Sequence, residues 1–150
     1  MLKGLDPRLN AEVLYCLRAM GHGDVLAITD TNFPGDSIAR DTVHGNLLRM
    51  DNLTAAEAVQ AVLSVMPLDT FVDDFAMRMQ VVDAPDEIPE PQKEVQTMID
   101  AAEGLPRPMI GVERFAFYEQ ARKSYAVIQT GEQRFYGCVL LRKGVIGPDA

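Results

Sequence analysis

The feature that most constrains the fold of this chain is the alternation of two apolar patterns along it. Segments with apolar residues at helical spacing alternate with short, nearly continuous apolar runs such as Val25–Thr29. Helical spacing is typical of a helix with one buried face, and a short continuous run is typical of a strand covered on both faces. The alternation predicts an α/β fold: a three-layer α/β/α arrangement with a central, mostly parallel sheet. The length favours a single domain over residues 1–150.

Capping residues and helix breakers set the bounds of the predicted elements. Asn10 is a candidate N-cap, Thr54 and Glu57 form a capping-box pattern, and glycine or proline follows the expected helix ends. The expected helices cover residues 11–20, 55–66, 94–102 and 113–123. The expected strands cover residues 25–29, 75–82, 109–112, 125–129 and 135–141, with a turn at 130–134.

The charge and hydropathy of the chain argue against two kinds of partner. The net charge is −8, whereas nucleic acids and anionic lipid surfaces are bound by basic faces. No apolar run approaches the roughly 20 residues of a membrane-spanning helix. We therefore expect neither a nucleic-acid nor a membrane partner. Residues 1–7 hold no extended apolar stretch, so we expect no signal peptide and a cytoplasmic location.

Several common catalytic and cofactor motifs are missing from the chain. The glycines at 21 and 23 precede a strand and do not open a helix, so they do not form a phosphate-binding loop. Two cysteines and two histidines show no zinc-ligand spacing. Cys16 and Cys138 lie in apolar segments, and we interpret both as inert core thiols rather than a nucleophile or a disulfide.

His22 is the best candidate for proton transfer. It lies between two glycines in a connection from helix to strand, and an unperturbed imidazole has a pKa of about 6.5. Asp30 follows the predicted strand 25–29, at the carboxyl end where such sheets bind ligands. His22 would lie at the opposite end, so a neighbouring subunit or a long curved loop would be needed to bring them together. The alternative is that His22 hydrogen-bonds a helix C-terminus; His44 is interpreted as structural.

Five separated segments, in collinear order, resemble one known family. The sequence resembles the L-fucose mutarotase and D-ribose pyranase family over nearly the whole chain. Arg114 and the Phe-Tyr-Glu run after it are similar to the fucose branch, because the ribose branch usually has a histidine near that position. The matching segments are Met20–Asp24, Asp30–Pro34, Pro67–Thr70, Glu113–Glu119 and Tyr136–Gly137.

The resemblance implies an isomerase that interconverts the anomers of a free aldose such as L-fucose, without a metal or organic cofactor. It implies a homo-oligomeric ring, a decamer or octamer, with its pockets at subunit contacts. His22 matches the acid/base residue of the family. The positions that match sugar-binding residues are Asp30, Arg114, Tyr136 and Gly137, and those that match residues at or near the pocket are Asp69 and Tyr118.

Cys138 is a departure from the family pattern. The family usually has asparagine after the Tyr-Gly pair, and a thiol is a weaker donor and acceptor than an amide. Either the pocket contacts fewer hydroxyls at this substrate-binding position, or a backbone group replaces the amide, or the substrate differs. Two rival functions therefore stay open: a ribose-type pyranase, and a sugar-binding protein without turnover.

The chemistry of anomer exchange fits these residue types independently of the family. Opening a sugar ring requires one proton to reach the ring oxygen while another leaves the anomeric hydroxyl, which suits imidazole and carboxylate groups. Arg114 would serve as a fixed fork of hydrogen-bond donors. Considered alone, Arg114 would more simply form a surface salt bridge with Glu113 or Glu119. Tyr118 or Tyr136 would stack on the apolar face of the sugar.

Overall fold

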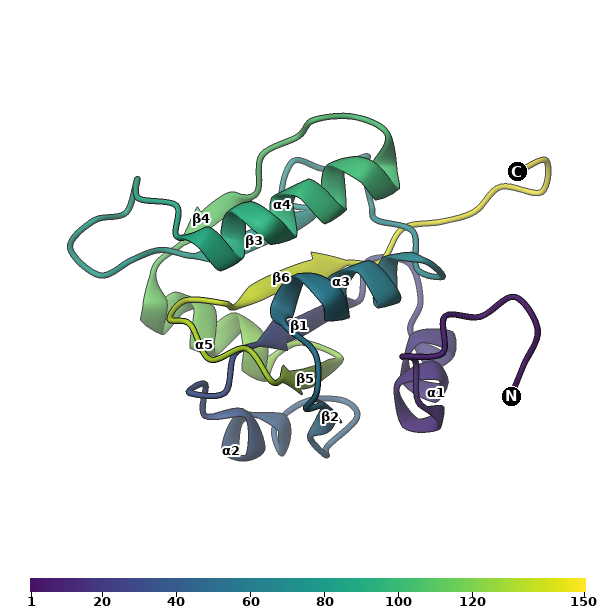
Figure 1. Cartoon of the computed structure of the whole chain (residues 1–150), viewed down its shortest axis with the longest axis horizontal. Coiled ribbons are helices and arrows are strands. Elements are labelled where there is room, and N and C mark those ends of the chain that lie inside the picture. Colours follow the sequence, from purple (N-terminus) through teal and green to yellow (C-terminus); the bar gives the residue numbers. More distant parts are fainter.

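The computed structural model describes residues 1–150 and alternates helices with strands (Figure 1). Its helices are α1 (Ala11–Ala19), α2 (Gly35–Ala39), α3 (Ala55–Leu63), α4 (Glu90–Glu103) and α5 (Arg114–Arg122). Its strands are β1 (Val25–Thr29), β2 (Leu48–Met50), β3 (Ala76–Met79), β4 (Ile110–Val112), β5 (Ala126–Thr130) and β6 (Val139–Arg142). The four longer helices match the predicted ones; α2 and β2 were not predicted. No helix combines the length and the apolar composition needed to cross a membrane.

One six-stranded sheet organises the chain, in the order β2-β5-β1-β6-β3-β4. Neighbours β2 and β5, β5 and β1, and β3 and β4 pair in parallel. Strand β6 alone runs in the opposite direction, and it pairs with β1 on one side and β3 on the other. The prediction of a mostly parallel sheet is therefore confirmed, with one reversed strand at its centre.

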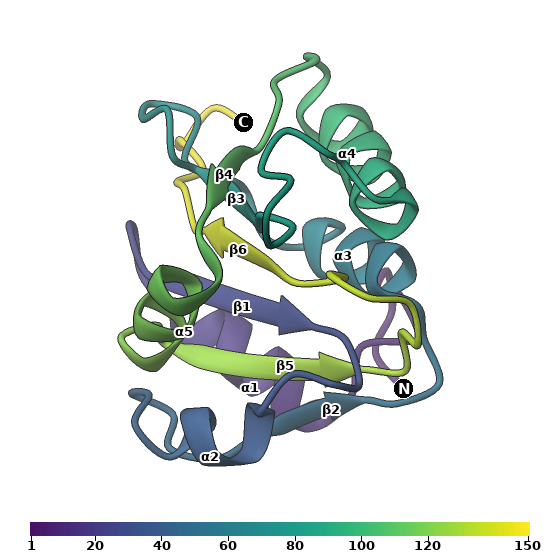
Figure 2. The ribbon, with the colours of Figure 1, turned by 90° about the vertical axis from the view of Figure 1, so that its left-hand side faces the viewer.

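Helices cover both faces of the sheet, which confirms the three-layer α/β/α prediction. Alternate residues of β1 point to opposite faces, so Leu26 and Ile28 join a core with α1, α3 and α4, and Ala27 joins a core with α2 and α5. Figure 2 shows α2 and α5 on one side of the sheet and α3 and α4 on the other. Both faces of the central strands β1, β5 and β6 are largely buried, as the continuous apolar runs predict.

The predicted strand 135–141 is wrong at its beginning. Tyr136 has a φ of 62°, a left-handed conformation that ends any extended pairing there, and β6 begins only at Val139. Thr130, assigned to a turn from the sequence, ends β5 instead. Residues 131–138 therefore form a loop, which we call the Tyr136 loop, and it leads from β5 directly into the reversed strand.

Candidate functional site

The predicted site residues lie in two groups at opposite ends of the central strands. Strand β1 begins shortly after His22 and ends just before Asp30. The antiparallel strand β6 follows Cys138, with Ile28 opposite Val139 and Val25 opposite Arg142. Asp30 and Cys138 therefore share one end of the sheet, and His22 lies at the other. We call the first group the Asp30 pocket. We call His22, together with Asp69 which it contacts, the His22 pair.

Asp30 is a buried carboxylate surrounded by backbone donors. Only 4% of the residue is exposed. Its Oδ1 accepts the N–H groups of Asn32 and Phe33, both at 3.0 Å, and its Oδ2 accepts the N–H of Gly137 at 3.2 Å. Burial raises the pKa of Asp30 above its ordinary value, while these donors oppose the rise. The backbone donors therefore offset only part of the cost of burying the charge.

Tyr136 is held at both its backbone carbonyl and its side-chain hydroxyl. The Nε2 of Gln92 donates to the backbone carbonyl of Tyr136 at 2.9 Å. The N–H of Val82 donates to the Tyr136 hydroxyl at 3.2 Å, so this oxygen is an acceptor there. Because the phenolic proton is not used in that contact, it is available to a bound molecule.

Gly137 allows the backbone of the Tyr136 loop to approach Asp30. A Cβ at this position would lie 2.7 Å from the Cγ of Glu132 and 3.4 Å from the Cβ of Asp30. Any side chain would therefore push the loop away and lengthen the hydrogen bond from Gly137 to Asp30.

Arg114 and Tyr118 come from the first turns of α5 and form a joined pair. The Nε of Arg114 donates to the Tyr118 hydroxyl at 2.9 Å, and the guanidinium carbon lies 5.4 Å from the centre of each of the rings of Phe115 and Tyr118. The salt bridge of Arg114 with Glu113 or Glu119 does not form: Glu113 caps α5, and Glu119 pairs with Arg122. That simpler interpretation of Arg114 is wrong.

A cavity of about 220 Å³ lies between these groups. Of the predicted residues, its lining includes Asp30, Arg114, Tyr118, Tyr136 and Cys138. The Cys138 thiol is buried, and burial together with the charge of Asp30 raises its pKa well above the usual value, so it remains a protonated thiol. The sequence reasoning missed four lining residues, Asn32, Phe33, Met79 and Phe135, of which the first two lie inside the motif that begins at Asp30.

The second group joins His22 to Asp69. The Nε2 of His22 lies 3.2 Å from the Oδ2 of Asp69, although 47 positions separate them in sequence. About half of the His22 side chain is exposed, whereas that of Asp69 is 6% exposed and its Oδ1 has no hydrogen-bond partner. The exposed ring of Phe71 stands edge-on to His22, with 6.5 Å between ring centres. The alternative that His22 bonds the end of α1 is wrong, because Lys143 donates to the carbonyls of Leu17 and Met20 there.

The remaining candidates lie outside both groups. His44 is half-buried and packs against Tyr15, as a structural histidine would. Cys16 is a free, buried thiol. No three His, Cys, Asp or Glu side chains gather as a metal-ligand set. A larger cavity of about 340 Å³ lies beside α1, but it is lined mainly by Leu and other apolar residues and contains none of the predicted site residues.

The fold and these two polar groups define an α/β protein with a polar cavity at the end of its sheet where such folds usually bind small molecules. Comparison with known families makes the assignment specific. The chain belongs to the RbsD / FucU transport protein family, whose model matches residues 3–146. The resemblance inferred from the five motifs is therefore confirmed.

Individual relatives match along nearly their whole length. The human fucose mutarotase is 40% identical, over 97% of this chain and 94% of that protein. The crystal structure of protein Atu2016, described as a proposed sugar-binding protein, is 60% identical with a TM-score of 0.96, covering 98% of this chain and 97% of the other. The fucose mutarotase of Streptococcus pneumoniae, solved with L-fucose, is 33% identical with a TM-score of 0.86, covering 97% of this chain and 100% of the other.

Proposed function

We propose that this protein is a mutarotase that interconverts the α and β anomers of L-fucose or a closely related free aldose. The observation that carries the proposal is the Asp30 pocket, in a chain that is 40% identical to a fucose mutarotase over almost its full length. The pocket offers a buried carboxylate, an arginine and two phenols around one small cavity, which is the chemistry that hydroxyl groups require.

Each group in the Asp30 pocket has a distinct role in holding the sugar. The Asp30 carboxylate accepts from sugar hydroxyls through the lone pairs that its three N–H donors leave free. Arg114 donates through its guanidinium, which Tyr118 holds in place. The phenolic proton of Tyr136 donates to a sugar oxygen. The rings of Phe33 and Phe135 line the same cavity and cover the apolar face of the pyranose.

His22 supplies the acid and base chemistry. An ionised Asp69 can only accept, so the Nε2 of His22 carries a proton toward it and the Nδ1 is the free base. The Nδ1 takes the proton of the anomeric hydroxyl while the Tyr136 phenol gives its proton to the ring oxygen, and the ring C–O bond breaks to give the open aldehyde. Rotation of the aldehyde followed by the reverse transfers closes the ring on its other face.

The two groups must come from different copies of the chain to act on one sugar. Within one copy they lie at opposite ends of β6, whose four residues span roughly 14 Å at the usual rise of a strand. We propose that a neighbouring copy brings its His22 pair to each Asp30 pocket, in a closed ring of eight or ten subunits. Exposed aromatic residues support a contact on both sides: Phe71 beside His22, and Phe115 and Phe135 beside the pocket.

We also propose that the enzyme acts in the cytoplasm. Its two cysteines are free and buried, which is usual in a reducing compartment, and no disulfide is needed to hold the fold.

The proposal is tested by saturation-transfer NMR of anomer exchange on L-fucose and D-ribose. We expect faster exchange on fucose, and we expect His22→Ala to remove the roughly 10²–10⁴-fold acceleration that a positioned acid/base group supplies. His44→Ala, which removes the other imidazole of the chain, is the matched control and should retain the wild-type rate. Faster exchange on ribose would end the fucose assignment. Wild-type exchange in His22→Ala would end the catalytic one.

A further inference from the structure

We propose that Glu132 is a positioning residue for the Tyr136 loop, and that its charge holds the sugar-contacting part of this loop against Asp30. The inference rests on the proposed function, because it concerns the same pocket. It starts from an unusual feature: Glu132 is a charged side chain that is 3% exposed, yet it does not line the cavity.

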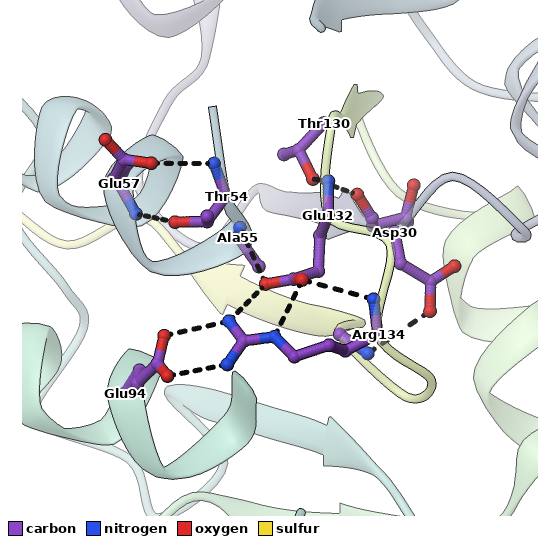
Figure 3. Close-up of polar contacts among 10 residues, drawn as sticks. Asp30, Thr54, Ala55, Glu57, Glu94, Thr130, Glu132 and Arg134 are labelled. Atoms are coloured by element: carbon purple, nitrogen blue, oxygen red, sulfur yellow. Dashed lines mark hydrogen bonds and ion pairs between the residues drawn. The ribbon is translucent and has the colours of Figure 1, made fainter. Parts of the chain in front are cut away.

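The Glu132 carboxylate is fully engaged by donors from the loop and from α3. Its Oε1 accepts from the Nη2 of Arg134 at 2.8 Å and from the N–H of Ala55 at 3.4 Å. Its Oε2 accepts from the Nε and the backbone N–H of Arg134, at 3.0 and 3.2 Å (Figure 3). Burial alone would raise the pKa of Glu132, but the contacts with Arg134 outweigh it and lower the pKa, so the group is ionised.

Arg134 extends this contact to α4. Its Nη1 and Nη2 donate to the two carboxylate oxygens of Glu94, at 2.7 and 2.9 Å, so one guanidinium joins two carboxylates (Figure 3). Gln92, two residues earlier in α4, is fully buried and donates to the carbonyls of Met79 and Tyr136. Helix α4 therefore holds the Tyr136 loop at two points, of which Glu132 controls one.

The side chain of Glu132 also packs directly behind Gly137. The Cγ of Glu132 would lie 2.7 Å from a Cβ at Gly137, with Asp30 near the same position at 3.4 Å. The carbonyl of Glu132 accepts from the N–H of Thr31, which follows Asp30, at 2.9 Å. A shift of Glu132 therefore moves both partners of the hydrogen bond between Gly137 and Asp30.

A charge at this position selects one conformation of the loop more strongly than a neutral group would. A buried carboxylate is costly unless its lone pairs accept hydrogen bonds, and here Arg134 and Ala55 supply the donors while Glu94 holds Arg134 in place. A neutral amide carries two donors where two of these acceptors are needed, so it tolerates other loop conformations. Small displacements of binding groups reduce catalysis strongly.

Glu132→Gln tests the inference, with Glu57→Gln as its matched control. Both are glutamates that accept from backbone N–H groups at the N-terminus of α3, but Glu57 contacts only Thr54 and does not touch the loop (Figure 3). For Glu132→Gln we expect KM for fucose to rise about ten- to hundredfold with a smaller change in kcat. We also expect faster amide hydrogen exchange across residues 131–138. Glu57→Gln should leave both readouts at wild-type values.

Either readout at the control value in Glu132→Gln would overturn the inference. Amide exchange needs no turnover, so it tests the role of Glu132 independently of activity. If the wild type did not act on fucose, that result would overturn the proposed function and not this inference. Glu94→Gln is a second variant, at the more exposed far end of the network, for the case that Glu132→Gln does not fold. It should change both readouts in the same direction, and wild-type values there would also contradict the inference.

Discussion

At the scale of single residues, Asp30 combines two opposing influences on one carboxylate. Its removal from water favours the neutral acid, and three backbone N–H groups favour the ion. The balance leaves its pKa above the ordinary value, so Asp30 becomes protonated at a higher pH than an ordinary aspartate does. The acceptor strength of the Asp30 pocket is therefore tied to pH.

We expect kcat/KM for fucose exchange to fall as pH is lowered from about 7 to about 4, because Asp30 becomes protonated at a higher pH than a free aspartate. For the same reason, Asp30 should favour folding most at acid pH, and this contribution should diminish as pH rises through its pKa. Saturation-transfer NMR across the pH range measures the first effect. Asp30→Asn should be weakly active without this acidic limb, and an unchanged limb in that variant would assign it to another group.

The residues that the sequence identified are those with a local signal. Asp30 follows an apolar run, and Arg114, Tyr118 and Tyr136 lie in recognisable motifs. The contact of His22 with Asp69 and the burial of Glu132 depend on how distant segments pack together. The spacing of residues in the sequence indicates neither feature. The sequence pattern predicts a strand at Phe135, so it does not indicate that this residue lines the cavity.

At the scale of elements, the end of β6 fixes the end of α1. Lys143 directly follows β6, and its Nζ donates to the carbonyls of Leu17 and Met20 at 2.7 and 2.5 Å. The N–H of Gly23 donates to the carbonyl of Lys143 at 2.9 Å. A cation at a helix C-terminus is favourable, and here it also holds the connection that carries His22.

We expect Lys143→Met to lower the free energy of unfolding by about 1–2 kcal/mol, because the last carbonyls of α1 lose a charged donor in a partly buried position. Chemical denaturation measures the difference. Lys123→Met, which removes an exposed lysine at the end of α5, is the control and should change stability by less than about 0.5 kcal/mol. Equal losses in the two variants would show that the contacts of Lys143 contribute nothing particular.

Local chemistry also explains which elements could be predicted. The Asn10 cap, the capping box of Thr54 and Glu57, and the left-handed Gly104 after α4 are all observed, and each is a short-range signal. Helix α2 has no side-chain cap, and β2 has three residues that pair only with β5. Such short elements exist because of tertiary contacts, so the sequence pattern alone does not reveal them.

At the scale of the whole molecule, each copy holds the Asp30 pocket and the His22 pair apart. Asp30 and His22 lie at opposite ends of the sheet, and β6 fixes their separation. A contact between different faces of identical subunits closes into a ring when the rotation between neighbours allows it. Under the proposed shared site, activity would depend on the contact between subunits.

We expect two impaired variants to recover activity when they are mixed. If each site combines the Asp30 pocket of one copy with the His22 pair of another, a co-refolded mixture of His22→Ala and Asp30→Asn should give about a quarter of the wild-type exchange rate. Half of the pockets keep Asp30 and half of the pairs keep His22, so about a quarter of the sites have both. His22→Ala mixed with Asp69→Asn is the control and should give none, because both residues belong to the same pair. A monomeric mass by light scattering, or no recovery in the first mixture, would contradict the shared site.

The reversed strand β6 carries a consequence for how this family can change during evolution. Its four residues connect the Cys138 end of one group to the Lys143 end of the other. An inserted or deleted residue there would alter their separation and turn every following side chain to the other face. Natural relatives should therefore keep residues 139–142 at a constant length.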